Sequence, residues 1–279
     1  MERYLEALVE AAREVLGGGF VGAYAAGSLA LDAFQADRSD IDIALLCRDK
    51  LAEDVKRELV RRLRHDALPC PARGLELVVY TVGAAQSGTA EPAYQVELND
   101  GPAMDFRQTL DPADRSRADG TFWYGLDRSI LRQSGRVLAG PPASEVFAEL
   151  SPDDLRNLLI DSLRWWMALP TPGGDQPAAG ADDAVLGACR ALVRHRHGTW
   201  LAKIDAGRHL LAAGYKPAEV IERSIAARAG GLPPSGPQVR AFQHDVLQEI
   251  SGRIEATAPQ GAVVPNTTTA SPVTRGADR

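Results

Sequence analysis

The chain has 279 residues, 45% of them hydrophobic and 24% charged, and its formal net charge at pH 7 is −6. This length suits one large domain or two smaller ones. The acidic balance speaks against an extended nucleic-acid-binding surface, which needs clustered lysine and arginine. Cys47, Cys70 and Cys189 are scattered and form no CxxC pair, so neither a disulfide framework nor a zinc site is indicated. Reduced thiols in the cytoplasm are the expectation.

The N-terminal segment, MERYLEALVEAAREVL, is acidic and amphipathic. It lacks the basic start and apolar centre of a signal peptide. Its apolar residues recur at helical spacing, so a helix is expected over residues 2–16, ended by the glycines at 17–19. The chain has no run of about 18 apolar residues, and no membrane span is expected.

Apolar and β-branched runs in the first part of the chain predict strands separated by helices. The first run ends at Gly27, and the last, AMDFRQTL, gives the weakest signal. Short helices fit over residues 29–35 and 51–63. The expected strands cover residues 20–27, 40–47, 75–82 and 103–110. Residues 1–110 are therefore expected to be mixed α/β.

The second part of the chain has helical patterns and no strand signal after residue 120. The segment TFWYGLDRSILRQSG predicts one helix. Ser151 and Pro152 are typical of an N-cap and a first turn, and open the next helix. Further helices are expected over 183–196, 200–213, 217–229 and 237–255. These patterns predict an α/β domain over 1–135, an all-α domain over 136–256 and a disordered tail over 257–279.

A pair of aspartates marks the strand DIDIALLC. Asp40 and Asp42 project from one face because side chains alternate along a strand. Carboxylates this close repel unless a cation lies between them, and Mg²⁺ prefers such oxygen ligands. Upstream, Gly27 and Ser28 form a turn whose N–H groups could meet phosphate. The alternative is an edge strand with a solvent-facing polar side.

This combination of Gly-Ser, a spacer and D-x-D resembles the nucleotidyltransferase superfamily that includes DNA polymerase β. SDID, GLELVVYTV, GRVLAGPP and CRALVRHRHGTWLAKIDAGRHL also resemble segments of the streptomycin/spectinomycin 3″-adenylyltransferase family. The resemblance covers roughly residues 15–255. It implies an α/β nucleotidyltransferase domain with a mixed sheet, followed by a helical-bundle domain.

The resemblance also implies roles for single residues. Asp40 and Asp42 would bind Mg²⁺, as two ions, while Gly27 and Ser28 hold the terminal phosphates of ATP. Glu76 would be the general base, with a third metal ligand or a solvated strand residue as the alternatives.

In the helical half, the resemblance implies that Arg190 and Lys203 cross the interdomain cleft to the phosphates. The alternative is that both are cations on a helix surface.

Candidate acceptor contacts are an aromatic residue and several polar ones, as expected for a hydroxyl-rich cationic substrate. Trp166 matches a substrate-contacting tryptophan of the family, with core packing as the alternative, whereas Trp165 is expected to pack or face solvent. Asn99 stands where streptomycin-modifying members carry a second tryptophan, so streptomycin is expected to be a poor substrate. Asp182 and Asp183 are candidates, with N-capping of the 183–196 helix and complementarity to its dipole as the alternative. Glu97, on the first domain's side, completes the acceptor set.

The sequence thus predicts a monomeric, cytoplasmic, Mg²⁺-dependent enzyme that moves AMP from ATP to a hydroxyl of a small aminoglycoside-like acceptor and releases pyrophosphate. Alternatives are the same chemistry on another natural product, a protein or a tRNA, or a non-catalytic nucleotide-binding protein. A tRNA acceptor would call for a basic groove, which the acidic composition does not indicate.

Overall fold

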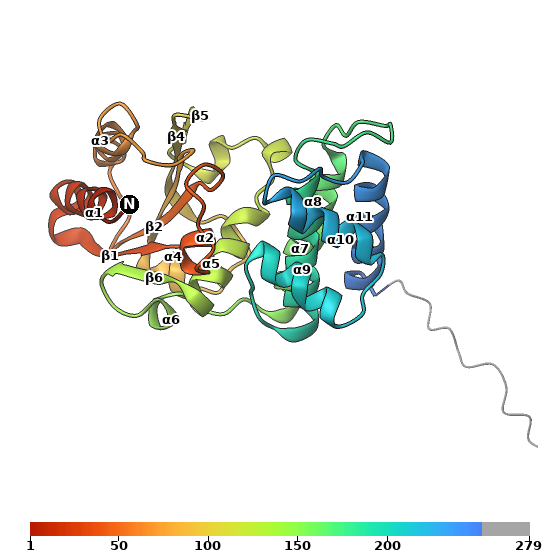
Figure 1. Ribbon diagram of the computed structural model, residues 1–279. Helices are drawn as coiled ribbons and strands as arrows, with labels where there is room; N and C mark the ends of the chain where they lie inside the picture. Colours follow the sequence, from red (N-terminus) through yellow and green to blue (C-terminus); the bar gives the residue numbers. More distant parts are fainter. Residues whose placement is uncertain (253–279) are drawn as a thin grey trace, which may run out of the picture.

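The computed structural model describes residues 1–252 and divides into a sheet-containing part and a helical part (Figure 1). The disordered tail expected over 257–279 lies outside the described residues. Within residues 1–252, every helix is too short or too polar to cross a membrane. The order of α/β first and all-α second agrees with the expectation from the sequence.

A mixed sheet of six strands forms the first part, in the order β5-β4-β3-β2-β1-β6. Strands β2 and β3 are parallel, and all other neighbours are antiparallel. The strands are β1 (Phe20–Ala25), β2 (Ile41–Cys47), β3 (Leu75–Thr81), β4 (Tyr94–Gly101), β5 (Met104–Thr109) and β6 (Arg136–Ala139). The four strands expected from the sequence correspond to β1, β2, β3 and β5.

Two strands were absent from the sequence expectation. Strand β4 carries Glu97, Asn99 and Asp100, residue types that are depleted in strands. Strand β6 has only four residues, too few to show alternation, and pairs with β1 at the edge of the sheet. The expectation of no strand after residue 120 was wrong, and the sheet includes residues beyond 135.

Both faces of the sheet are covered, because alternate strand residues point into different cores. Ala23, Ile43 and Leu45 pack in the core beneath α1 (Glu2–Leu16) and α3 (Glu53–Leu63). Tyr24 and Leu46 face the opposite core. The helices on that side are α4 (Val82–Gln86), α5 (Phe122–Ser134) and α6 (Ala143–Val146). The brief helix expected over 29–35 is a single turn, α2 (Gly27–Ala30).

The helical part packs around α8, whose Val185, Leu186 and Cys189 are fully buried. Ser151 caps α7 as expected, accepting a hydrogen bond from the Asp154 backbone N–H at 3.1 Å. The helices are α7 (Pro152–Ala168), α8 (Ala181–His197), α9 (Lys203–Ala212), α10 (Ala218–Ala227) and α11 (Gly236–Ile250).

Helix α5 joins the two parts. Its Tyr124 and Leu131 pack in the core of the sheet, while Phe122, Leu126 and Ile130 pack in the core of the helical part. One helix therefore contributes to both cores and lies beside the groove between them.

Candidate functional site

The acidic side chains of the site come from one end of two parallel strands. Asp42 on β2 and Glu76 on β3 are register partners, so their side chains share one face of the sheet. Asp40 precedes β2 and lines the same cavity as these two residues. The sheet therefore gathers the three carboxylates that the sequence singled out.

Gly27 lies directly against this cluster. It has a φ of +52°, and a Cβ added there would lie 1.8 Å from Asp42 Oδ2. Beside it, Ser28 Oγ and Asp40 Oδ1 are buried and have no hydrogen-bond partner among the described residues. A side chain at position 27 would displace the Asp42 carboxylate, and the two unpartnered oxygens are free for a ligand.

Gly27→Ala is expected to lower the rate of the nucleotidyl transfer predicted from the sequence at least ~10-fold, because misplacing a reacting group by about 1 Å can cost ~10²-fold. The left-handed backbone conformation adds a strain of roughly 1–2 kcal/mol. Gly83→Ala is the matched control, since a Cβ at Gly83 meets nothing within 4 Å and φ is not positive. Steady-state rates of the two variants should differ; equal rates would contradict this role of Gly27.

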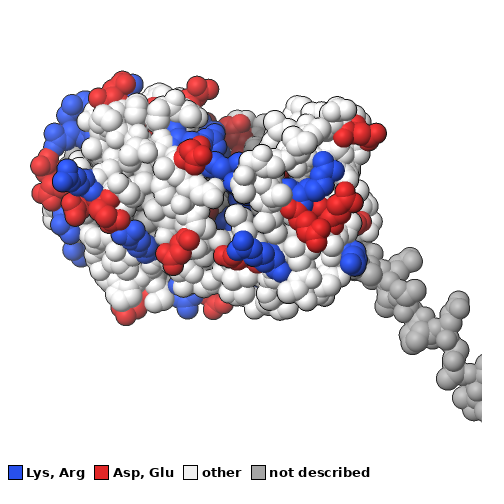
Figure 2. Space-filling model, viewed as in Figure 1, with Lys and Arg blue, Asp and Glu red and all other residues white. Residues whose placement is uncertain are grey.

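A cavity of about 390 Å³, here called the cationic pocket, opens beside the carboxylates. Arg38 and Arg73 come to it from the sheet part. The helical part contributes Arg190, Lys203 and Arg228. Lysine and arginine atoms are visible along the groove where the two parts meet (Figure 2). The pocket thus combines a carboxylate cluster with a set of cations suited to phosphate.

The carboxylates are destabilised as anions. Burial, with the charges of Asp127 and Asp40, raises the pKa of Asp42 to about 7. Burial and the charges of Asp42 and Asp40 raise the pKa of Glu76 to about 8. On the opposite side, burial lowers the pKa of Arg190 and of Lys203. A cation bound between the carboxylates would relieve their repulsion.

Asp182 and Asp183 occupy a different place from the expected one. Asp182 is buried and pairs with Arg38 at 2.6 Å and Arg228 at 3.2 Å. Asp183 pairs with Lys203 at 2.5 Å and with Arg228. Neither aspartate caps α8, which begins after Gly180 without a side-chain cap, but both lie in its first turn, where a negative charge complements the helix dipole. Both aspartates therefore hold the cations of the cationic pocket, because the start of α8 faces them.

A second cavity, of about 270 Å³ and here called the aromatic pocket, is lined by residues of the sheet and shares Asp42 and Glu76 with the cationic pocket. Trp123, Tyr124 and Trp165 line it. The residues that line both this pocket and the cationic pocket are Asp42, Glu76, Trp123 and Asp127. A group transferred from a ligand in one pocket to a ligand in the other would move past these four side chains.

Asp127 on α5 is a fourth carboxylate at this junction and was absent from the sequence expectation. Burial and the charge of Glu76 raise its pKa to about 7. The available signal was its position: Asp127 follows Trp123 by four residues and precedes Ile130 by three, so it interrupts the apolar face of α5.

The two neighbouring tryptophans divide between the pockets. Trp166 lines the cationic pocket and Trp165 the aromatic pocket. The Trp165 indole also donates to the Ala118 carbonyl at 2.9 Å and meets Trp123 edge to face, with ring centroids 5.4 Å apart. Trp165 packs against Phe122 and Trp123, as expected. It also lines the aromatic pocket and joins the two parts there, a position that the sequence did not indicate.

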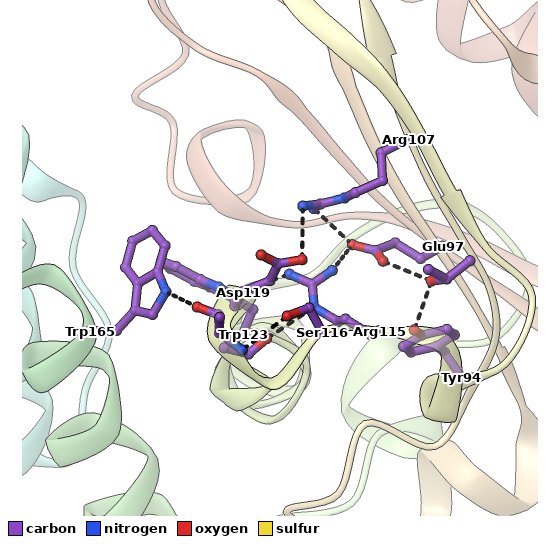
Figure 3. A network of polar contacts seen from close by, with 11 residues as sticks. Tyr94, Glu97, Arg107, Arg115, Ser116, Asp119, Trp123 and Trp165 are labelled. Carbon is purple, nitrogen blue, oxygen red and sulfur yellow. Dashed lines mark hydrogen bonds and ion pairs between the residues drawn. The ribbon is translucent and has the colours of Figure 1, made fainter. Parts of the chain in front are cut away.

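Glu97 is buried in a polar network at the aromatic pocket (Figure 3). It accepts from Arg115, from Arg107 Nη2 at 3.1 Å and from Thr109 Oγ1 at 2.9 Å. Burial acts to raise the pKa of Glu97, but the Arg115 hydrogen bond and charge outweigh it and the pKa is lowered. Its expected contact with a cationic acceptor does not fit this arrangement, because two arginines already neutralise the charge.

Asn99 lines the aromatic pocket, as expected for a residue that meets an acceptor. In the amide orientation that satisfies both groups, its oxygen accepts from Arg107 Nη2 at 2.8 Å and its nitrogen donates to the Leu98 carbonyl at 3.1 Å.

The chain matches no known family profile and no curated protein. Among solved structures, it is similar to spectinomycin adenyltransferase AAD(9) from Enterococcus faecialis, solved with ATP and spectinomycin. The TM-score is 0.62 with 14% sequence identity, over 89% of this chain and 98% of that one.

The chain has the fold of this adenyltransferase. The similarity extends over the sheet part and the helical part, since it covers 89% of the chain. An adenyltransferase fold is what the sequence resemblance implied, and that expectation is confirmed.

The sequence did not indicate several residues that line the two pockets. Apart from Trp123 on α5, they are charged residues in connecting segments or on β5, where local patterns do not show which cavity a side chain reaches. They are Arg38, Arg73, Arg107, Arg115, Asp119, Trp123 and Arg228.

Proposed function

We propose that this chain transfers AMP from ATP to a hydroxyl of a small acceptor and releases pyrophosphate. The observation that carries the proposal is the position of Asp42 and Glu76, which line both the cationic pocket and the aromatic pocket. ATP would occupy the first pocket and the acceptor the second. The reacting atoms would then meet between them.

The cationic pocket supplies what a triphosphate needs. Arg38, Arg190, Lys203 and Arg228 are partly neutralised by Asp182 and Asp183 or by the carboxylate cluster. Arginine binds phosphate in a bidentate way and lysine acts as a point charge. The unpartnered Ser28 Oγ offers a further hydrogen bond to a phosphate oxygen.

Asp40 and Asp42 fit a magnesium site shared with the nucleotide. Asp40 Oδ1 is buried without a partner, and carboxylate oxygens are preferred ligands of Mg²⁺. Within residues 1–252, no group of three or more His, Cys, Asp or Glu side chains is arranged to hold an ion by itself. The two aspartates would thus share up to two ions with phosphate oxygens and water, as is usual for Mg²⁺. Bound Mg²⁺ neutralises charge that develops on transferring phosphates.

Glu76 would accept the proton of the acceptor hydroxyl as it attacks the α-phosphate. Its pKa of about 8 lies near neutral pH, where a general base is most effective. Glu76 lines both pockets, which a base between nucleotide and acceptor requires. A metal-ligand role is the alternative, and the Glu76→Gln measurement in the Discussion separates the two.

The aromatic pocket favours a small-molecule acceptor over a macromolecular one. Its volume of about 270 Å³ is close to the lower limit of small-ligand sites, roughly 300 Å³, and its aromatic lining is typical of them. AAD(9) was solved with spectinomycin, so this compound is the first acceptor to test.

The test is pyrophosphate release from ATP and Mg²⁺ in the presence of spectinomycin, then of other aminoglycosides, nucleosides and small RNAs. Release that depends on one small hydroxylated acceptor is the expected result. Calorimetry with ATP and Mg²⁺ accompanies it. ATP binding without release for any acceptor would instead identify a non-catalytic nucleotide-binding protein, and release only with RNA would contradict the small acceptor.

A further inference from the structure

The cations of the cationic pocket divide into two groups. Arg73 and Arg190 form no ion pair with an acidic side chain among residues 1–252. Arg38, Lys203 and Arg228 are each paired with one or both of the aspartates in the first turn of α8. Three of the five cations that line the pocket are thus held by anions of the protein itself.

Asp183 is the one of these two aspartates that lines the pocket, and its side chain is 30% exposed. Its Oδ1 lies 2.5 Å from Lys203 Nζ and also contacts the Arg228 guanidinium. Burial acts to raise the pKa of Asp183, but the charges and hydrogen bonds of Lys203 and Arg228 outweigh it and the pKa is lowered. Asp183 is therefore an anion at neutral pH.

Asp182 holds the same network from behind. Its side chain is only 6% exposed, and its Oδ2 lies 2.6 Å from Arg38 Nη2 and 3.2 Å from Arg228 Nε. Arg228 is therefore held by two consecutive residues of α8. The helix dipole stabilises negative charge in this first turn. With this support, Asp183 is expected to stay in place when a ligand enters the pocket.

A phosphate that binds Lys203 comes close to Asp183. Hydrogen bonds from an ammonium group to an anionic oxygen are about 2.8 Å long, so a phosphate oxygen on Lys203 Nζ lies within roughly 5.5 Å of Asp183 Oδ1. Like charges at this distance repel appreciably in a partly buried site, where the effective dielectric constant is far below that of water. Asp183 therefore competes with a phosphate for Lys203 and also repels it.

This competition affects pyrophosphate more than ATP. ATP can gain affinity from its base and its sugar, whereas pyrophosphate depends on contacts to its charged oxygens. A pocket with five unpaired cations would hold pyrophosphate tightly, and release of product limits the turnover of many enzymes. An anion within the pocket lowers that affinity without removing any of the cations.

We propose that Asp183 is an internal counter-anion of the phosphate site, which lowers the affinity of the cationic pocket for pyrophosphate and so lets this product leave. The inference rests on the proposed function, because it takes the cationic pocket as the site of the phosphates. Lys203 and Arg228 contact Asp183 when no phosphate is bound, exchange it for phosphate oxygens when nucleotide binds, and return to it when pyrophosphate leaves.

The test measures binding of inorganic pyrophosphate with Mg²⁺ by calorimetry, without nucleotide or acceptor. Asp183→Asn is expected to bind pyrophosphate at least ~10-fold more tightly than the unsubstituted protein, because it removes a nearby charge of the same sign as the ligand. Asp183→Glu keeps the charge, so its affinity should stay within about threefold. The matched control is Asp205→Asn, which changes the net charge equally on α9 at a side chain that is 56% exposed and outside both pockets.

A role of Asp183 in orienting Lys203 is the rival explanation, and Lys203→Met separates the two. This substitution should weaken pyrophosphate binding, and adding Asp183→Asn to it should tighten binding again at least ~10-fold, because the repulsion persists without Lys203. A residue that only orients Lys203 would have no effect in this background. The double variant also removes both charges of the pair, so neither is left without its partner in the fold.

Three outcomes would overturn the counter-anion: weaker or unchanged pyrophosphate binding in Asp183→Asn, no effect of this substitution in the Lys203→Met background, or no pyrophosphate binding by any variant. A general loss of structure cannot produce the tighter binding that is expected. The transfer of AMP is tested separately, since it fails if no acceptor elicits pyrophosphate release, whereas these binding measurements need no acceptor.

Discussion

Asp42→Asn is expected to reduce AMP transfer at least ~10³-fold, and yet to raise the melting temperature of the metal-free protein at pH 8. The loss of activity follows if Asp42 is a charged ligand of Mg²⁺, as proposed above, because the stabilisation of the transition state by the ion is worth several kcal/mol. The gain in stability follows because Asp42 lies among Asp40, Glu76 and Asp127, and its charge is unfavourable there.

The pH dependence has a definite sign. In the folded protein the pKa of Asp42 is raised from 3.8 to about 7 and that of Glu76 from 4.5 to about 8. At a pH between the unfolded-state and folded-state pKa values, the folded protein binds more protons than the unfolded chain. The stabilisation that the protonated forms of Asp42 and Glu76 provide is therefore complete below about pH 4 and is lost as the pH rises to about 8. The gap between Asp42→Asn and the unsubstituted protein should therefore widen from pH 5 to pH 8.

Thermal unfolding in the presence of a chelator measures this effect. An advantage of about 1 kcal/mol would appear as a rise of roughly 2–4 °C in a protein of this size. Adding Mg²⁺ and ATP should reverse the order, since only the unsubstituted protein gains from binding them. Asp105→Asn, an exposed aspartate on β5, is the control and should change neither activity nor stability. If Asp42→Asn melts below the unsubstituted protein at pH 8, the charge of Asp42 does not destabilise the metal-free fold and this prediction is wrong.

The local part of the site was accessible from the sequence because it depends on neighbours in the chain. Alternation along one strand places Asp40 and Asp42 on one face, and the glycine at 27 is close to them in sequence. The pairing of Asp42 with Glu76, by contrast, depends on the register of two strands more than 30 residues apart. Only the family resemblance suggested Glu76, since no local pattern carries that register.

The acceptor side was harder to predict because its charges are set by tertiary partners. A glutamate is normally expected at the surface. Glu97 is nevertheless buried, because Arg115 and Arg107 neutralise its charge. Arg107 and Arg115 also explain why β4 was not predicted. A segment with several polar residues resembles a loop in sequence, and only the hydrogen bonds of the folded protein show that these residues can belong to a strand. Asp182 was expected at the acceptor, but it lies against Arg38 and Arg228, which no sequence pattern connects to it.

Glu76→Gln is expected to lower the turnover of AMP transfer at least ~100-fold while ATP, Mg²⁺ and acceptor bind nearly as before. General-base assistance contributes ~10²–10⁴-fold, and glutamine keeps the size of the side chain but cannot accept the proton at neutral pH. Because Asp42 loses a neighbouring charge, ATP and Mg²⁺ binding should not weaken. The measurement combines single-turnover rates with calorimetry of ATP and Mg²⁺.

The two roles open to Glu76 give different results in this pair of measurements. A base affects only the rate, whereas a metal ligand affects the affinity for ATP and Mg²⁺ together with the rate. Raising the pH discriminates further, because the rate of the unsubstituted enzyme should rise through the pKa of a base and that rise should disappear in Glu76→Gln. Glu145→Gln, an exposed glutamate on α6, is the control. Turnover retained in Glu76→Gln would exclude both roles. Asp127, which lines both pockets and is not assigned to the metal, would then be the remaining candidate to accept the proton.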